Sequence, residues 1–156
     1  MNVIAFDQID LDILRLLQGD AWLSSNEIAK MLRMKNSTVS SRISRMKTSG
    51  LITGSTTIID HSKISSVLIS FTSVRINNHS TDSLLEFQAN VEMFPEVREC
   101  YHMTGAFDFL LKIVVHNMSA YNSFVVNKLG KLNNVGSLQS YFVINERKRE
   151  IGYPVN

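Results

Sequence analysis

The chain has 156 residues, of which 44% are hydrophobic and 19% charged, and its formal net charge is +2. This length allows one ordinary domain or two small ones, and the composition excludes a disordered chain. The single cysteine, Cys100, excludes an internal disulfide, and the most apolar stretch, residues 109–115, is too short for a transmembrane helix. The first residues lack the basic start and long apolar run of a signal peptide, so we expect a cytoplasmic protein with no membrane partner.

Charge is distributed unevenly over the first third of the chain. Residues 1–26 contain four aspartates and one arginine, a balance of −3, whereas residues 27–54 contain six basic side chains and one Glu27, a balance of +5. A basic stretch within a nearly neutral chain indicates an anionic partner that binds at one place.

Residues 1–54 have the apolar spacing of three short helices. Asp7 is a suitable N-cap for the first helix, and Ser24 with Glu27 forms a capping-box pattern at the start of the second. The apolar positions share one face in each helix, namely Ile9, Ile13, Leu16 and Leu17 in the first and Ile28 and Leu32 in the second.

The third predicted helix begins with Asn36 as its cap and ends at Gly50. Val39, Ile43 and Met46 fall on one face, and seven of the thirteen residues from 37 to 49 are serine or threonine. Because only residues 33–35 separate it from the second helix, the pattern indicates a helix-turn-helix.

The polar face of this third helix has two interpretations, a solvated surface or a surface that binds DNA. The basic excess and the short hydroxyl side chains favour DNA, because short side chains let a helix approach the major groove and arginine pairs with guanine. We expect Arg42 and Arg45 to face outward and Lys47 to contact phosphate. The predicted DNA-binding residues are Lys35, Asn36, Ser37, Thr38, Ser40, Ser41, Arg42 and Arg45.

The segment after Gly50 switches to β-type residues, which predicts a β-hairpin-like wing or a linker strand. We therefore divide the chain into a helix-turn-helix domain (residues 1–54), a linker strand (55–65) and a second domain (66–156).

The second domain alternates strand and helix patterns. Strands are predicted in residues 65–76, 97–103, 107–115 and 136–148, with helices in residues 80–94 and 118–132. The order β-α-β then β-α-β indicates a ferredoxin-like sheet with both helices on one face. The expected fold class is α+β, and the uncovered sheet face is a natural dimer surface.

Two polar features in the second domain leave alternatives open. Cys100 and His102 share one face of a strand, but a metal site needs further ligands, so we expect a packed strand and no metal or other cofactor. Asp108 follows the turn at Gly105, where it either caps that turn or holds the amino group of a small ligand.

The sequence resembles the leucine-responsive and asparagine-responsive (Lrp/AsnC) regulators over roughly residues 6–147. The N-terminal half contains the patterns S-x-x-E-L/I-A, T-V-x-x-R-I and G-x-I as "SSNEIA", "TVSSRI" and "GLI". The C-terminal half contains "TGAFDFLLKIVVHNMSAY", which is similar to the family pattern G-x-x-D, an apolar strand and D/N-M-x-x-Y.

This resemblance implies a prokaryotic, nucleoid-associated transcription regulator that binds double-stranded DNA. It implies a homodimer formed through the sheets, with further assembly into tetramers or octamers. It also implies an amino acid or related metabolite as effector, and the implied effector-binding residues are Thr104, Gly105, Ala106, Asp108, Ser140, Tyr141 and Phe142.

The chain departs from the family pattern at three positions. Arg33 stands where the family often has glycine, and Lys35 stands where serine or asparagine is usual. Ala106 replaces an acid that is frequent in amino-acid-sensing members, which leaves a DNA-architectural protein without an effector as an alternative. A sirohaem-decarboxylase-like enzyme shares this architecture, but no histidine-rich motif supports it, so we expect no catalytic residues.

Overall fold

The computed structural model describes residues 6–148 and 152–155. It divides into a helical unit, made of residues 6–58 together with 148 and 152–155, and a sheet unit of residues 59–147. The sequence predicts boundaries at residues 54 and 65 and assigns the C-terminal residues to the second domain. Residues 152–155 instead belong to the helical unit, where the Arg15 Nε donates a hydrogen bond of 2.9 Å to the Val155 carbonyl oxygen.

The helical unit contains three helices, as predicted: α1 (Gln8–Gly19), α2 (Ser25–Met31) and α3 (Asn36–Thr48). The predicted N-cap at Asp7 and the predicted capping box between Ser24 and Glu27 are confirmed, and Asp7 forms a second capping box with Asp10. The apolar faces meet in a core of buried side chains, which are Ile13, Ile28, Ala29, Val39 and Met46. The helical spacing of these residues therefore accounts for the packing of the unit.

The turn between α2 and α3 closes with two hydrogen bonds, from the Met34 amide to the Ala29 carbonyl (2.8 Å) and from the Arg33 amide to the Lys30 carbonyl (3.3 Å). This is the Schellman arrangement, in which the residue after the helix takes a left-handed conformation and is usually glycine. Arg33 occupies that position with φ 54°. Arg33, one of the three residues that depart from the family pattern, thus has the strained backbone conformation of this turn.

The cap predicted for α3 is wrong. Lys35, rather than Asn36, is the N-cap residue, and its side chain makes no capping hydrogen bond. Asn36 is the first residue of the helix. Since lysine has no acceptor atom, its side chain offers nothing to the amides of the first turn of α3.

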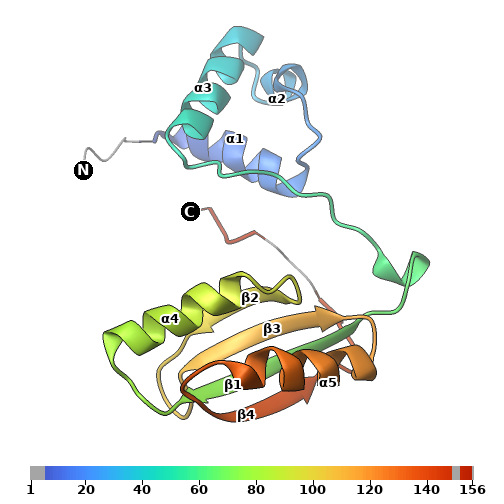
Figure 1. The fold of residues 1–156 in the computed structure, drawn as a ribbon. Helices are drawn as coiled ribbons and strands as arrows, with labels where there is room; N and C mark the ends of the chain where they lie inside the picture. Colours follow the sequence, from blue (N-terminus) through green and yellow to red (C-terminus); the bar gives the residue numbers. More distant parts are fainter. Residues whose placement is uncertain (1–5, 149–151, 156) are drawn as a thin grey trace. The chain divides into compact units, whose positions relative to one another are not determined.

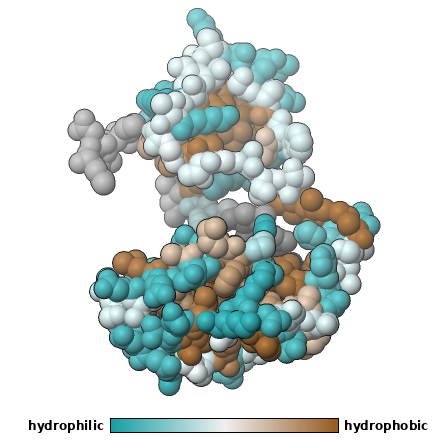
Figure 2. Space-filling view, in the orientation of Figure 1, coloured by the Kyte–Doolittle hydropathy of each residue, from teal (hydrophilic) through white to brown (hydrophobic). Residues whose placement is uncertain are grey.

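The predicted wing and linker strand do not form, because residues 51–60 contain no strand and residues 61–63 form a short 3₁₀ turn, η1. An extended segment needs a neighbouring strand to pair its amides and carbonyls, and a single chain supplies none here. Ile58, Ile59 and Ile64 are exposed in this linker, which shows as a brown stretch in Figure 2.

The sheet unit has four strands, which are β1 (Leu68–Ile76), β2 (Val97–His102), β3 (Phe109–Val115) and β4 (Val135–Phe142). They form one antiparallel sheet in the order β2-β3-β1-β4 (Figure 1). Helix α4 (Thr81–Glu92) connects β1 with β2, and α5 (Met118–Asn127) with the 3₁₀ turn η2 (Leu129–Lys131) connects β3 with β4. The predicted ferredoxin-like α+β fold is confirmed.

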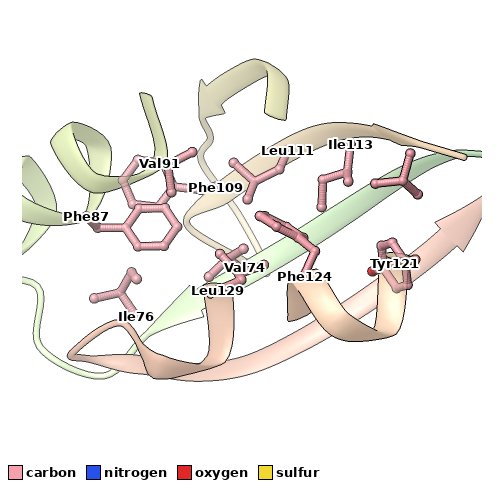
Figure 3. Close-up of a cluster of buried hydrophobic side chains, with 11 residues drawn as sticks. Val74, Ile76, Phe87, Val91, Phe109, Leu111, Ile113, Tyr121, Phe124 and Leu129 are labelled. Carbon is pink, nitrogen blue, oxygen red and sulfur yellow. The ribbon is translucent and has the colours of Figure 1, made fainter. Parts of the chain in front are cut away.

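Alternation along the strands separates the two faces of this sheet. Every second residue of β3 is buried, from Phe109 to Val115. These side chains and those of β1 pack against α4, α5 and η2 (Figure 3), and the core consists of Val74, Ile76, Phe87, Val91, Phe109, Leu111, Ile113, Val115, Tyr121, Phe124 and Leu129. The helices therefore cover one face of the sheet and leave the other face uncovered.

Within the part of the chain that the structure describes, no helix combines the length and the apolar character needed to cross a bilayer.

Candidate DNA-binding and effector-binding sites

The exposed face of α3 carries a row of short polar side chains. Among the predicted DNA-binding residues, Thr38 and Arg42 are half-buried, and the exposed ones are Lys35, Asn36, Ser37, Ser40, Ser41 and Arg45. Val39 and Met46 hold the opposite face in the core. The helix thus presents hydroxyl and amide groups over its first two turns, on a surface with little side-chain bulk.

Arg42 and Arg45 are paired with acidic side chains, and only Arg45 is exposed as predicted. Arg42 Nη1 lies 2.8 Å from both carboxylate oxygens of Asp7 and 2.8 Å from Oδ1 of Asp10. Arg45 Nη2 donates to Oδ2 of Asp10, and its guanidinium lies 5.9 Å from the centroid of the Phe6 ring. The spacing within α3 alone could not reveal this, because the acidic partners are the N-cap residue and a first-turn residue of α1.

Asp10 is the centre of this cluster. Its side chain is 0% exposed, compared with 22% for Arg42 and 47% for Arg45, and Oδ2 also accepts a hydrogen bond from the Asp7 amide. The hydrogen bond from Arg42 is the main cause that lowers the pKa of Asp7, and hydrogen bonds from Arg42 to Asp10 and Asp7 raise the pKa of Arg42. We call Asp7, Asp10, Arg42 and Arg45 the acid clamp.

Other basic side chains flank the hydroxyl row. Arg33 and Lys35 are exposed before α3, and Lys47 is exposed in its last turn. Within residues 6–148 and 152–155, these three side chains have no acidic partner within salt-bridge distance. They are therefore the cations near α3 that are available to an anionic ligand.

The predicted effector region is only partly brought together. Thr104, Gly105 and Ala106 are exposed in the loop between β2 and β3, where Gly105 has φ 113°. This positive φ explains the glycine, because other residues rarely adopt it.

Asp108 is held by its own chain. Oδ2 accepts a 2.7 Å hydrogen bond from the Ile76 amide, and Oδ1 lies 2.8 Å from Nε2 of His79. Burial raises the pKa of Asp108, but the bonds from Ile76 and His79 outweigh it, so the pKa is lowered overall. The carboxylate ties the end of β1 to the start of β3, and neither bond caps the turn at Gly105.

The predicted residues of β4 point to opposite faces of the sheet. Ser140 and Phe142 lie on the helix-covered face, where the Phe142 ring packs edge-on against Tyr121 at 4.9 Å and Ser140 hydrogen-bonds to the Tyr121 hydroxyl. Tyr141 lies on the uncovered face and is 55% exposed. A single small ligand does not contact all three.

A shallow pocket of about 200 Å³ lies beside Ala106 on the uncovered face. It is lined by Ser73, Arg75, Ala106, Phe107, Ser137 and Gln139. Only Ala106 belongs to the predicted set. Alternate residues of a strand face the same side of the sheet, and Ser73 pairs with Gln139 and Arg75 with Ser137. This alternation could have identified these four lining residues from the sequence. The lining contains one guanidinium and several hydrogen-bond donors but no carboxylate.

Cys100 and His102 have packing roles. The His102 ring stacks on Phe109 at 4.8 Å, and burial raises the pKa of the half-buried Cys100 thiol. Among the described residues, no group of three or more histidine, cysteine or acidic side chains converges to hold a metal ion.

Comparison with known proteins adds an independent line of evidence. The chain matches the Lrp/AsnC ligand binding domain over residues 69–152 and a winged helix-turn-helix DNA-binding domain over residues 6–53. It is 32% identical to the leucine-responsive regulatory protein of Salmonella typhimurium, over 92% of this chain and 87% of that protein.

Two solved structures show the same fold. An AsnC family transcriptional regulator from Agrobacterium tumefaciens has a TM-score of 0.88 and 32% identity, covering 96% of this chain and 97% of that one. A transcriptional regulator from Neisseria meningitidis, solved as an L-Met complex, has a TM-score of 0.89 and 28% identity, covering 97% and 98%. The helix-turn-helix unit, the sheet unit and these similarities agree, and the chain belongs to the Lrp/AsnC family of transcription regulators.

Proposed function

We propose that this regulator binds specific double-stranded DNA through the exposed face of α3. The observation that carries the proposal is the row of short polar side chains, Asn36, Ser37, Ser40 and Ser41, on a helix anchored by a buried apolar face. Serine and asparagine reach base edges and phosphates without holding the helix away from the groove. Arg33, Lys35 and Lys47 then contact phosphates on either side.

The assembly that we propose is a homodimer joined through the uncovered sheet face, with tetramers or octamers built from it. Phe71 and Leu110 are only partly covered on this face, and Tyr141 is exposed there. A two-fold dimer carries two copies of α3, so its DNA half-sites lie one helical turn or more apart.

The DNA-binding proposal is tested by selecting duplexes from a random library with the full chain. A recurring sequence is expected, with paired half-sites. Replacing Ser40 with glutamate places a negative charge on the proposed contact face and is expected to weaken binding to the selected duplex about tenfold or more. Ser66→Glu, at an exposed position before β1, makes the same change away from α3 and leaves the affinity close to that of the wild type. No enriched sequence would contradict the proposal.

We also propose that a small metabolite with a carboxylate, such as an amino acid, binds in the pocket beside Ala106. The Arg75 guanidinium at this pocket suits a carboxylate, and the lining has no acidic group for a free ammonium. The Neisseria relative was solved with L-Met, which supports an amino acid as the class of ligand. Binding would alter DNA occupancy through different affinities for two assembly states.

Calorimetry with the twenty amino acids and their 2-oxo acid counterparts tests this effector. Arg75→Gln is expected to abolish binding of any ligand found, whereas Arg98→Gln, which is outside the pocket lining, is expected to preserve it. Binding of the 2-oxo acids as tightly as the amino acids would show that the ammonium adds nothing. Failure of every compound to bind would favour the second candidate, an effector-independent DNA-architectural protein, which the internal engagement of Asp108 supports.

A further inference from the structure

The acid clamp changes the charge that α3 presents to DNA. The sequence gives residues 27–54 a balance of +5, but two of those positive charges, Arg42 and Arg45, are neutralised by two negative charges from α1. Asp7 is also 52% exposed, so one of these two negative charges lies at the surface beside Arg42. The electrostatic attraction of α3 for phosphate is therefore weaker than the charge of residues 27–54 indicates.

We propose that the acid clamp withholds Arg42 and Arg45 from DNA phosphates and so weakens the part of DNA binding that does not depend on sequence. This inference rests on the proposed role of α3 in DNA binding. Asp10 is the positioning residue, because it touches both arginines and no part of it faces the solvent.

The arginines stay in the clamp because their release would leave Asp10 unpaired. Both carboxylate oxygens of this fully buried group receive guanidinium hydrogen bonds. Removing the partners of a buried charge is strongly unfavourable, whereas a phosphate at the protein surface gives an exchangeable contact in water. DNA phosphate therefore does not displace Arg42 from Asp10, and it reaches at most the solvent-facing part of the Arg45 side chain.

Keeping the arginines from phosphate weakens the part of the binding that does not depend on sequence. Each cation that neutralises a phosphate strengthens binding to every DNA sequence and steepens the salt dependence. Hydroxyl and amide contacts to base edges strengthen binding only to the matching sequence. With few available cations, α3 therefore binds random DNA weakly and relies on base contacts at its own site.

The test compares Asp10→Asn and Asp7→Asn with Asp12→Asn in the full chain. All three remove one negative charge, but Asp12 is paired with Arg15 rather than with α3. Asparagine also preserves the N-cap at position 7, so Asp7→Asn changes the charge beside Arg42 while keeping α1 intact and leaving Asp10 in place. Circular dichroism confirms folding, and fluorescence anisotropy measures affinity for the selected duplex and for a shuffled one across a salt series.

We expect Asp10→Asn to bind the shuffled duplex several-fold more tightly than the wild type, because both arginines lose their buried partner. Its plot of log K against log salt concentration steepens by about 0.9 for each arginine released. Asp7→Asn, in which both arginines keep Asp10, and Asp12→Asn have slopes near that of the wild type. Equal slopes in a folded Asp10→Asn and in Asp12→Asn would overturn the inference while leaving the DNA-binding proposal standing.

A second pair of variants separates the two proposals further. Lys35→Gln removes a proposed phosphate contact and is expected to reduce the slope by about 0.9, whereas Arg45→Gln leaves the slope unchanged. An equal reduction in both variants would show that Arg45 contacts phosphate, which contradicts the clamp. Absence of DNA binding by the wild type would overturn both proposals.

Discussion

Arg33 has a backbone conformation that favours glycine, with φ 54° in the turn before α3. A non-glycine residue in the left-handed region typically costs about 1 kcal/mol or more of folding free energy. The exposed guanidinium of Arg33 lies next to the start of α3, where our proposal gives it a phosphate contact. This residue therefore exchanges some stability for local positive charge.

Two substitutions at this position separate strain from charge. Arg33→Gly relieves the strain and is expected to raise the unfolding free energy of the helical unit by about 1 kcal/mol. Arg33→Ala removes the same charge without relieving the strain. Both are expected to weaken DNA binding equally, and only the glycine variant gains stability in urea denaturation. A stability gain of the same size in Arg33→Ala would contradict the role given to the backbone.

Asp108 makes the stability of the sheet unit depend on pH. Because its pKa is lower in the folded protein than in the unfolded chain, the stability that it contributes is full above roughly pH 4 and is lost as the pH falls through the folded pKa. Asp108→Asn is expected to reduce the stability of the sheet unit at neutral pH and to have less effect near pH 2. Denaturation series at the two pH values measure this, and an equal loss at both would contradict it.

Side-chain positions were the least predictable from sequence. The charge and spacing of Arg42 and Arg45 suggested DNA contacts, but their partners lie on α1, more than thirty positions away in the chain. Likewise, the two acceptor atoms of Asp108 are satisfied by Ile76 and His79, which no local pattern connects to it. Tertiary ion pairs and hydrogen bonds decide such side chains.

The helices and strands themselves were predictable, because hydrophobic spacing is a property of the local sequence. The buried residues Val39 and Met46 of α3 and the alternating burial of β3 both follow from that spacing. The structure of residues 51–60 was not predictable from local sequence. Their β-type residues form no strand, because no other strand lies beside them within one chain. The cap of α3 was misplaced by one residue, since Asn36 suits the cap position but Lys35 occupies it.

Because α3 lacks a side-chain cap, we can predict how substitutions at its ends change its stability. Lys35→Ser supplies a side-chain acceptor for the first turn and is expected to stabilise the helical unit by about 1 kcal/mol while weakening DNA binding. Lys47→Ser removes the same charge from the last turn, where a cation favours the helix dipole, so it is expected to lower stability slightly. Thermal denaturation distinguishes them; a lower melting temperature for Lys35→Ser would contradict this account of the cap.

For the whole molecule, the family and the fold class follow from two halves that support each other. The helix-turn-helix pattern and the βαββαβ order occur in one chain, and the family models match the two halves separately. The size of the assembly is not encoded in any local pattern, because it depends on how uncovered surfaces of several copies fit together.

The proposed dimer surface can be tested on the uncovered sheet face. Tyr141→Asp places a charge there and is expected to convert dimers into monomers in sedimentation velocity experiments, since the tyrosine is 55% exposed within one chain. Leu85→Asp makes a similar change on the outer surface of α4, where the leucine is also exposed, and is expected to leave the assembly unchanged. Dissociation by Leu85→Asp alone would place the interface on the helices.

The most direct test of DNA recognition by α3 is a comparison of affinities for the selected duplex and a shuffled duplex of equal length, by fluorescence anisotropy at several salt concentrations. The account predicts that the wild type prefers the selected duplex by at least about a thousandfold near physiological salt, with affinity for both falling as salt rises. Equal affinity for the two duplexes, or affinity that does not change with salt, would contradict it.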